Sequence, residues 1–235
     1  MTDLFQPENL PQRSGQRYVN VHNDFVLARM DWSIMMHRIM MVLVSSIDSR
    51  YDEGFERQFL YVSDLMKMTG NESTSMYRDA RKAVKALIRE PIEFETPDGS
   101  YAGMPLFSDM RYLQHKGLVS ALFHDKAQPY LLQLEKQFTS WRLDQTIPLT
   151  TSYAVRHYMI SKMVERRGRT NSHTFEMEDY RKKMAVEDKY DRFVDLRRRV
   201  LDPSMDQINS ETDLTADYTV DRNGQTRVGL KFIVR

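Results

Sequence analysis

The chain has 235 residues, of which 41% are hydrophobic and 11% aromatic, with 9 Gly and 8 Pro. This composition can supply a buried core for one large or two small domains, and it excludes a collagen-like or wholly disordered chain. The chain has no Cys and a formal net charge of only +1, and no apolar run approaches the roughly 18 residues of a membrane helix. The sequence therefore excludes disulfide frameworks and cysteine-ligated metal sites, and it favours a cytoplasmic protein.

The N-terminal third begins with a segment that has no regular pattern. Residues 1–19 are polar, which predicts a flexible arm. Asp31 to Asp48 is apolar on nearly every side, as expected of a buried helix, with a subunit contact as the alternative. Gln58 to Val62 is typical of a short strand.

The first helix-turn-helix follows this strand. Ser63 is a suitable N-cap for a short helix over 64–69, which Gly70 would end in the left-handed conformation. Thr74 can then cap a longer helix to about Arg89, because apolar residues recur at spacings of three and four. The opposite face of that helix is basic and carries Arg78, Arg81, Lys82, Lys85 and Arg89.

Strand signals complete the first unit. Ile92 to Glu95 leads into a turn at 97–99, and 104–114 is expected to pair with 118–123 as a β-hairpin. A helix over 125–138 is predicted to link this unit to the next.

A second unit repeats the order of elements. A helix capped by Thr151 or Ser152 and ending near Gly168 precedes a strand at 174–175 and a short helix over 177–184.

The remaining elements include the helix that matters most for function. A longer helix is predicted to begin near Asp188, and Pro203 in a first turn capped by Asp202 restarts a helix to about Asn209. A β-hairpin with its turn at 221–224 closes the chain.

Two copies of helix, helix-turn-helix and hairpin define the predicted architecture. The fold class is α+β, mainly helical, with two tandem winged-helix domains at 20–146 and 147–235 after the arm at 1–19. Basic residues concentrate in the second half of the chain, at 166–169, 181–183 and 197–199, so we expect contacts with a polyanion there.

The helix around residue 195 combines residue types that suit DNA. Spacing of about 100° per residue over 189–202 gathers apolar side chains on one side, with Val194 at its edge. An arginine fork can bond guanine O6 and N7, and a carboxylate can accept from cytosine N4. We therefore predict base readout by the outward-facing residues Arg192, Asp195, Arg198 and Arg199.

A solvated helix is the alternative for the same residues. Arg192–Asp195 and Asp195–Arg199 have the spacing of surface ion pairs. Arg197 falls among the apolar residues and is expected to extend towards a phosphate or an acidic neighbour. Further contacts with phosphate or from the hairpin wing are predicted for Arg197, Arg222, Arg227, Thr74, Ser75, Arg78, Arg81 and Lys82.

Four segments in order resemble the theta-type, iteron-binding plasmid replication initiators, the Rep/RepB initiator family with tandem winged helices. The resemblance covers residues 20–234 and is carried by Asn23 to Arg29, Leu131 to Thr139 (similar to an interdomain helix of the family), Leu149 to Tyr158, and Tyr190 to Asp213.

This resemblance implies a function as well as a fold. It implies a protein that binds direct repeats, the iterons, of double-stranded DNA at a plasmid origin as a monomer and represses its own promoter as a dimer. The second domain would make the main base contacts, through Arg192, Asp195, Arg198 and Arg199. The first domain would provide dimerisation and auxiliary DNA contacts, and a host helicase and a host initiator protein would be partners.

An enzyme and a plain regulator are the rival classes. The sequence has no Gly-Lys-Ser/Thr phosphate loop and no His-x-His pair beside which a tyrosine could nick DNA, so we expect no catalytic activity, no metal and no cofactor. A tandem winged-helix transcriptional regulator without initiator activity would have nearly the same sequence features, and that alternative stays open.

Overall fold

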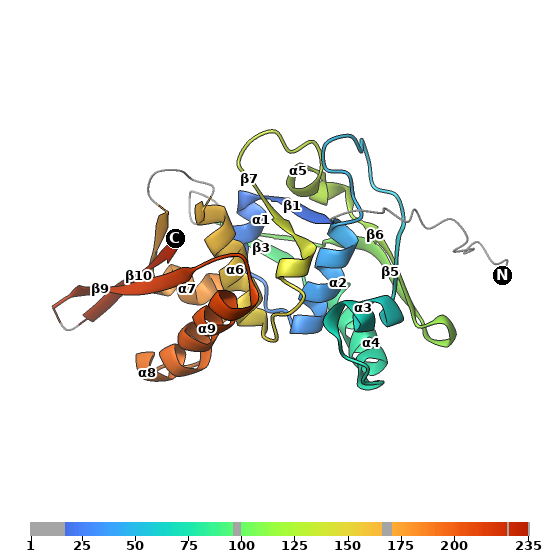
Figure 1. The fold of residues 1–235 in the computed structure, drawn as a ribbon. Coiled ribbons are helices and arrows are strands. Elements are labelled where there is room, and N and C mark those ends of the chain that lie inside the picture. The colour runs from blue at the N-terminus through green and yellow to red at the C-terminus, as the bar shows by residue number, and fades with distance from the viewer. Residues whose placement is uncertain (1–16, 96–99, 166–170, 225, 235) are drawn as a thin grey trace.

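The computed structural model describes residues 17–95, 100–165, 171–224 and 226–234 (Figure 1). The predicted turn at 97–99, the end of a helix near Gly168, the basic cluster at 166–169 and residues 1–16 of the predicted arm lie outside these ranges. No helix in the described ranges is both long and apolar enough to cross a membrane.

Two winged-helix units contain the same elements in the same order. The first has α2 (Ile34–Val44), β2 (Gln58–Tyr61), α3 (Val62–Thr69), α4 (Ser75–Leu87), β5 (Phe107–Leu113) and β6 (Leu118–Phe123). The second has α6 (Ser152–Glu165), β8 (Ser172–Glu176), α7 (Met177–Lys183), α8 (Phe193–Leu196), a π-helical turn Arg197–Leu201, α9 (Asp202–Glu211), β9 (Ala216–Asn223) and β10 (Thr226–Val234). Both sheets are antiparallel with matching strand orders, β2-β6-β5 and β8-β10-β9, which confirms the predicted repeat.

Further elements join the two units. β1 (Tyr18–His22) pairs with β7 (Phe138–Arg142), and β3 (Ile92–Glu95) pairs with β4 (Tyr101–Met104). Short helices complete the chain: α1 (Asn23–Leu27), α5 (Gln128–Leu131) and the 3-10 turns Gln114–Lys116, Asp125–Ala127 and Leu143–Gln145. Strand β1 begins inside the predicted arm, because Val19 is fully buried in the β1–β7 ladder.

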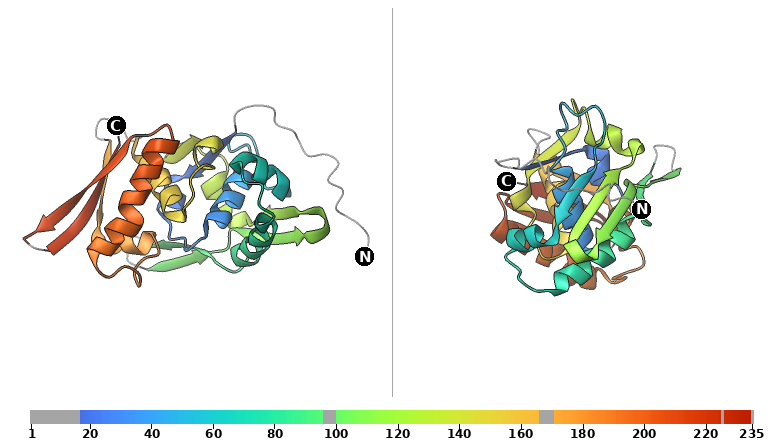
Figure 2. Two further views of the ribbon diagram at one scale, coloured as in Figure 1. Left: turned by 60° about the horizontal axis from the view of Figure 1, so that its bottom comes forward. Right: turned by 90° about the vertical axis from the view of Figure 1, so that its right-hand side faces the viewer.

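The two helix-turn-helix motifs lie on one face of an elongated molecule. Helices α4 and α8–α9 are at the bottom of Figure 1 and face the viewer in the left view of Figure 2. The hairpins β5–β6 and β9–β10 project at opposite ends. A long double-stranded ligand could therefore meet both motifs from the same side.

Helix α6 forms the centre of the core between the units. It packs against α1, α2, β7 and α9, and nearly every described residue from Ala154 to Val164 is buried. Arg156 on α6 is 2% exposed, and its Nη2 donates to the carbonyl oxygen of Ala28 (2.7 Å) and to that of Lys183 (3.4 Å). Burial lowers the pKa of Arg156 to about 10, so the guanidinium stays charged.

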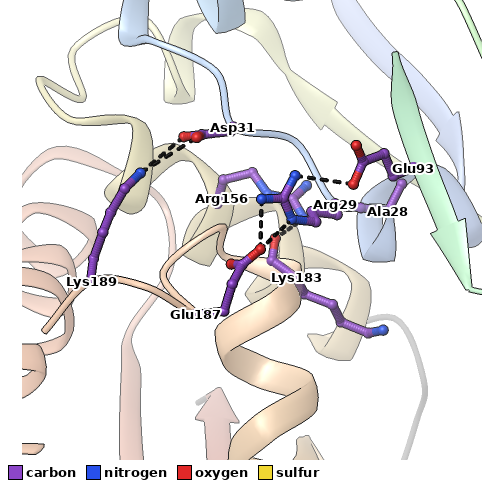
Figure 3. Close-up of polar contacts among 8 residues, drawn as sticks. All are labelled: Ala28, Arg29, Asp31, Glu93, Arg156, Lys183, Glu187 and Lys189. Carbon is purple, nitrogen blue, oxygen red and sulfur yellow. Dashed lines mark hydrogen bonds and ion pairs between the residues drawn. The ribbon is translucent and has the colours of Figure 1, made fainter. Parts of the chain in front are cut away.

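Ion pairs continue this junction towards the second helix-turn-helix (Figure 3). Arg29 lies 3.0 Å from Glu93 on β3 and 2.6 Å from Glu187, which follows α7. Lys189 lies 3.2 Å from Asp31. The segment that leads into α8 is therefore tied to residues 28–31 of the first unit.

Several predicted boundaries in the first unit are wrong. Helix α3 begins at Val62 after Tyr61, so Ser63 is inside it and is not its N-cap. Gly70 ends the helix in the left-handed conformation as predicted, with φ of 62°. Residues 101–104 form β4 and the wing strand starts only at Phe107, because Pro105 has no N–H with which to continue a ladder.

The predicted linker helix over 125–138 is also wrong. Only Gln128–Leu131 is α-helical, and Gln133 and Gln137 have φ of 50° and 52°, which a helix does not accommodate. The chain then enters β7, where Trp141 is 1% exposed. The left-handed residues Gln133 and Gln137 therefore interrupt the helical pattern before strand β7 begins at Phe138.

The second unit departs from prediction around α8. The helix starts at Phe193 and not near Asp188, because Tyr190 takes a left-handed φ of 56° and Arg181 donates hydrogen bonds to the carbonyls of Lys189 and Tyr190. Asp202 does not cap a helix and no new helix begins at Pro203, because the helical backbone continues from 193 to 211 through the π-helical turn. Strand β9 extends to Asn223, so the predicted 221–224 turn is shorter and begins at Gly224.

Candidate nucleic-acid interface

The helical segment Phe193–Glu211, here called the recognition helix, is anchored by its apolar side. Leu196, Val200 and Leu201 are fully buried, whereas Arg192, Arg198 and Arg199 are exposed. Helix α7 and the turn before Phe193 place this helix second in a helix-turn-helix. In that motif the N-terminal residues of the second helix reach base edges in the major groove.

Asp195 organises the predicted reading residues. Its carboxylate lies 2.8 Å from the Arg192 guanidinium and 3.3 Å from that of Arg198, and it is only 19% exposed against 76% and 70% for the arginines. One half-buried acid therefore holds two outward guanidinium groups on the same face. Both carboxylate oxygens of Asp195 accept hydrogen bonds from these two arginines. Within the described residues Arg199 makes no ion pair, so the Asp195–Arg199 pair expected of a solvated surface helix is not formed.

Arg197 connects the recognition helix to the wing through an acidic neighbour. Its Nε donates to Oδ2 of Asp202 (3.0 Å), while Oδ1 of Asp202 accepts from the Tyr218 hydroxyl on β9 (2.6 Å). Burial and this carboxylate raise the pKa of Tyr218, which keeps the hydroxyl a donor. The acidic neighbour expected for Arg197 is thus present, and its contact with phosphate stays a prediction.

The wing places two arginines beside the start of the recognition helix. Arg222 on β9 is opposite Arg227 on β10, and both are exposed. The Arg227 guanidinium lies 4.6 Å from the centroid of the Phe193 ring. The contact of Arg227 with Phe193 therefore places the wing against the first residue of the recognition helix.

The first unit contributes a separate basic surface on α4. Arg78, Arg81 and Lys82 are exposed, and Arg78 pairs only with its neighbour Asp79 (3.1 Å) among described acids. Thr74 occupies the N-cap position of α4 without a side-chain cap hydrogen bond, and the Ser75 hydroxyl lies 2.9 Å from that of Ser73. Helix α4, which carries these side chains, lies on the same face of the molecule as the recognition helix (Figure 2), and their contact with phosphates stays a prediction.

Two features of the site were not found by sequence reasoning. Val194 is 58% exposed on the outward side, although the 3.6-residue period predicts it at the edge of the apolar side. The ion pairs of Arg29 and Lys189 that fix the approach to the recognition helix join residues 158 positions apart, for which the sequence carries no local signal. Within the described residues, no group of three or more His, Asp or Glu side chains is placed to hold a metal.

Comparison with known proteins decides the family. The sequence model of the family described as Initiator Replication protein, WH1 matches residues 18–162, and that of Initiator Rep protein, WH2 matches residues 176–234. The chain belongs to the initiator replication proteins. The WH1 match extends into α6, a helix that the sequence assigns to the second domain.

Two further proteins are similar to this initiator replication protein. A crystal structure of the Pi initiator protein in complex with iteron DNA matches with a TM-score of 0.78 and 18% identity, covering 94% of this chain and 98% of that one. An uncharacterized 27.6 kDa protein of Escherichia coli is 22% identical over 204 residues, which is 84% of this chain and 83% of the relative. The first match shows a shared arrangement of both winged-helix units.

Proposed function

We propose that this protein initiates plasmid replication by binding direct repeats in the origin through both winged-helix units and recruiting the host replication machinery. The observation that carries the proposal is the placement of two helix-turn-helix motifs on one face, in a chain of the initiator replication family. The similar Pi initiator protein was solved with iteron DNA, which supports direct repeats as the ligand.

The two units would divide the work of recognition. Arg192 and Arg198, held by Asp195, have the geometry to meet base edges, and mixed guanidinium and carboxylate groups select sequence where lysines alone would not. The α4 surface of Arg78, Arg81 and Lys82 would neutralise phosphates and set the register on the duplex. Specificity is therefore assigned to the second unit and sequence-independent affinity to the first.

Initiation would depend on binding energy and not on catalysis. Bending and untwisting of the origin would be supported by contacts along the shared face, and strand separation would be completed by a host helicase and a host initiator protein. We also propose that dimers of the chain repress its own promoter, and that it acts in the cytoplasm.

Plasmid maintenance tests this proposal. The gene and its flanking DNA are cloned on a plasmid that lacks an origin, and we expect stable transformants with the wild-type chain and none with Arg198→Ala. The Arg50→Ala variant, whose side chain belongs to a loop after α2, controls for the effect of losing an arginine. Repression of a reporter without maintenance would instead identify a transcriptional regulator.

A nicking assay separates binding from catalysis. Supercoiled plasmid carrying the flanking DNA is incubated with the full chain and Mg²⁺ or Mn²⁺. We expect the DNA to stay supercoiled, and an open-circle product above the buffer control would overturn the non-enzymatic mechanism.

A further inference from the structure

Val194 is an apolar residue in a place where folding gives no reason for one. Its exposed fraction of 58% is the largest among the Val, Leu, Ile and Met side chains in the described ranges. It lies in the first turn of the recognition helix, on the side opposite the buried Leu196 and Val200. A β-branched residue is also a weaker helix former than alanine, so an exposed valine at this position does not help the helix form.

The surroundings of Val194 indicate what covers it. Arg198 follows one turn later on the same face, and Arg192 precedes it by two residues; both guanidinium groups are exposed. The exposed Arg227 lies against the neighbouring Phe193. An apolar side chain on the same face as Arg198, at the end of the helix where Arg192 and Arg227 are also exposed, suits a polyanion with an apolar group on its surface better than an apolar protein partner, for which these charges would have to be desolvated.

Double-stranded DNA offers one such group in its major groove. The C5-methyl of thymine is the apolar feature of the base edges, and small aliphatic side chains contact it in sequence-specific complexes. One helical turn advances 5.4 Å, about one to two base steps of about 3.4 Å, so residues 194 and 198 can address neighbouring base pairs.

We propose that Val194 reads a thymine by packing its methyl groups against the C5-methyl, one or two base pairs from the contact of Arg198. This inference rests on the proposed function, since it requires that the recognition helix lies in the major groove. It adds a residue that discriminates bases by a methyl group, where Arg198 discriminates by hydrogen bonds.

The experiment removes methyl groups from each partner in turn, first from thymine in the DNA and then from Val194 in the protein. A tight-binding duplex is selected from a random library with the full wild-type chain, and each thymine is changed in turn to deoxyuridine, which lacks only the methyl. We expect one position at which the wild type binds the deoxyuridine duplex about fourfold more weakly than the thymine duplex. A factor of about four corresponds to the transfer free energy of one methylene-sized group. Val194→Ala should lose a similar factor on the thymine duplex and show no difference between thymine and uracil at that position.

Two controls keep the result specific. Ile88→Ala removes a side chain that is 44% exposed at the end of α4, and it should keep the wild-type penalty for uracil. Urea unfolding should show that Val194→Ala is at least as stable as the wild type, since the side chain is outside the core and alanine favours the helix.

The possible failures are distinguishable. If the wild type selects no sequence, the proposed function fails and the inference fails with it. If a duplex is selected but Val194→Ala retains the same uracil penalty at every position, the thymine contact is wrong and the proposed function stands.

Discussion

The Arg227 guanidinium lies over the ring of Phe193, 4.6 Å from its centroid, so the wing of the second unit contacts the first residue of the recognition helix. The first unit has a comparable contact, because Tyr77 near the start of α4 lies against Gly117 at the wing turn. In both units an aromatic residue thus sets the distance between helix and wing.

Phe193→Leu tests the contact in the second unit. The variant keeps an apolar side chain but removes the cation–π attraction, so the free energy of unfolding should fall by about 0.5–1 kcal/mol. Binding to the selected duplex should weaken because the wing is held less firmly. Urea unfolding and a binding titration measure the two effects, with Tyr51→Leu, beside Arg50 on a distant loop, as control. Unchanged DNA affinity for Phe193→Leu would show that the contact does not position the wing.

The junction between the units makes a second prediction. Arg29 is partly buried between Glu93 and Glu187, so a double-mutant cycle of Arg29→Ala and Glu187→Ala should give a coupling of about 1 kcal/mol in unfolding, reduced at high salt. The exposed pair Glu178–Lys182 should give about 0.3–0.5 kcal/mol in the same cycle. Equal couplings for the two pairs would contradict a role for Arg29 in holding the units together.

The local parts of the fold follow from the sequence, and the parts set by distant contacts do not. Gly70 and the apolar stripe of α4 are local signals, and the structure confirms both. The start of the recognition helix depends on hydrogen bonds from Arg181 and on ion pairs of Arg29 and Lys189 with partners in other elements, so the helical period alone places it several residues too early.

In the candidate site, too, some features follow from the local sequence pattern and others do not. The helical period correctly puts Arg192, Asp195 and Arg198 on one exposed face. It cannot show that Asp195 pairs with Arg198 and not with Arg199, because one turn of helix brings both within reach. The local pattern does not predict strand β7, because its pairing with β1 joins residues more than a hundred positions apart.

Acidification is expected to destabilise the core through two histidines. His37 and His157 are fully buried, and burial together with the nearby charge of Arg156 lowers the pKa of each to about 3. Unfolded histidine has a pKa of about 6.5, so the unfolded chain takes up protons first as the pH falls below that value. The free energy of unfolding should be highest above pH 6.5 and fall below it by about 1.4 kcal/mol per pH unit for each histidine.

Urea unfolding between pH 7 and pH 5 measures this dependence. His37→Phe should remove the contribution of one histidine from the slope, whereas replacement of the exposed His115 by Gln should leave the slope unchanged. A slope in His37→Phe equal to that of the wild type would show that His37 is not held neutral in the folded protein.

Gly117 provides a test of backbone geometry at the first wing. Its φ is 56°, and an added Cβ would lie 2.6 Å from Cε1 of Tyr77. Gly117→Ala should therefore lower the free energy of unfolding by about 1–3 kcal/mol through strain and displacement of Tyr77. Gly54→Ala is the matched control, since nothing lies within 4 Å of its added Cβ. Thermal unfolding compares the two, and equal midpoints would contradict the close approach of wing and helix.

The central claim is that the recognition helix reads bases while α4 contacts phosphates, and a comparison of two arginine variants tests it most directly. Binding of Arg198→Ala and Arg81→Ala is titrated on the selected duplex and on a scrambled one over a range of salt concentrations. Arg198→Ala should cost about 1–3 kcal/mol on the selected duplex alone, and Arg81→Ala should weaken both duplexes and lower the salt slope by about one. Equal losses on the two duplexes for Arg198→Ala would contradict the account.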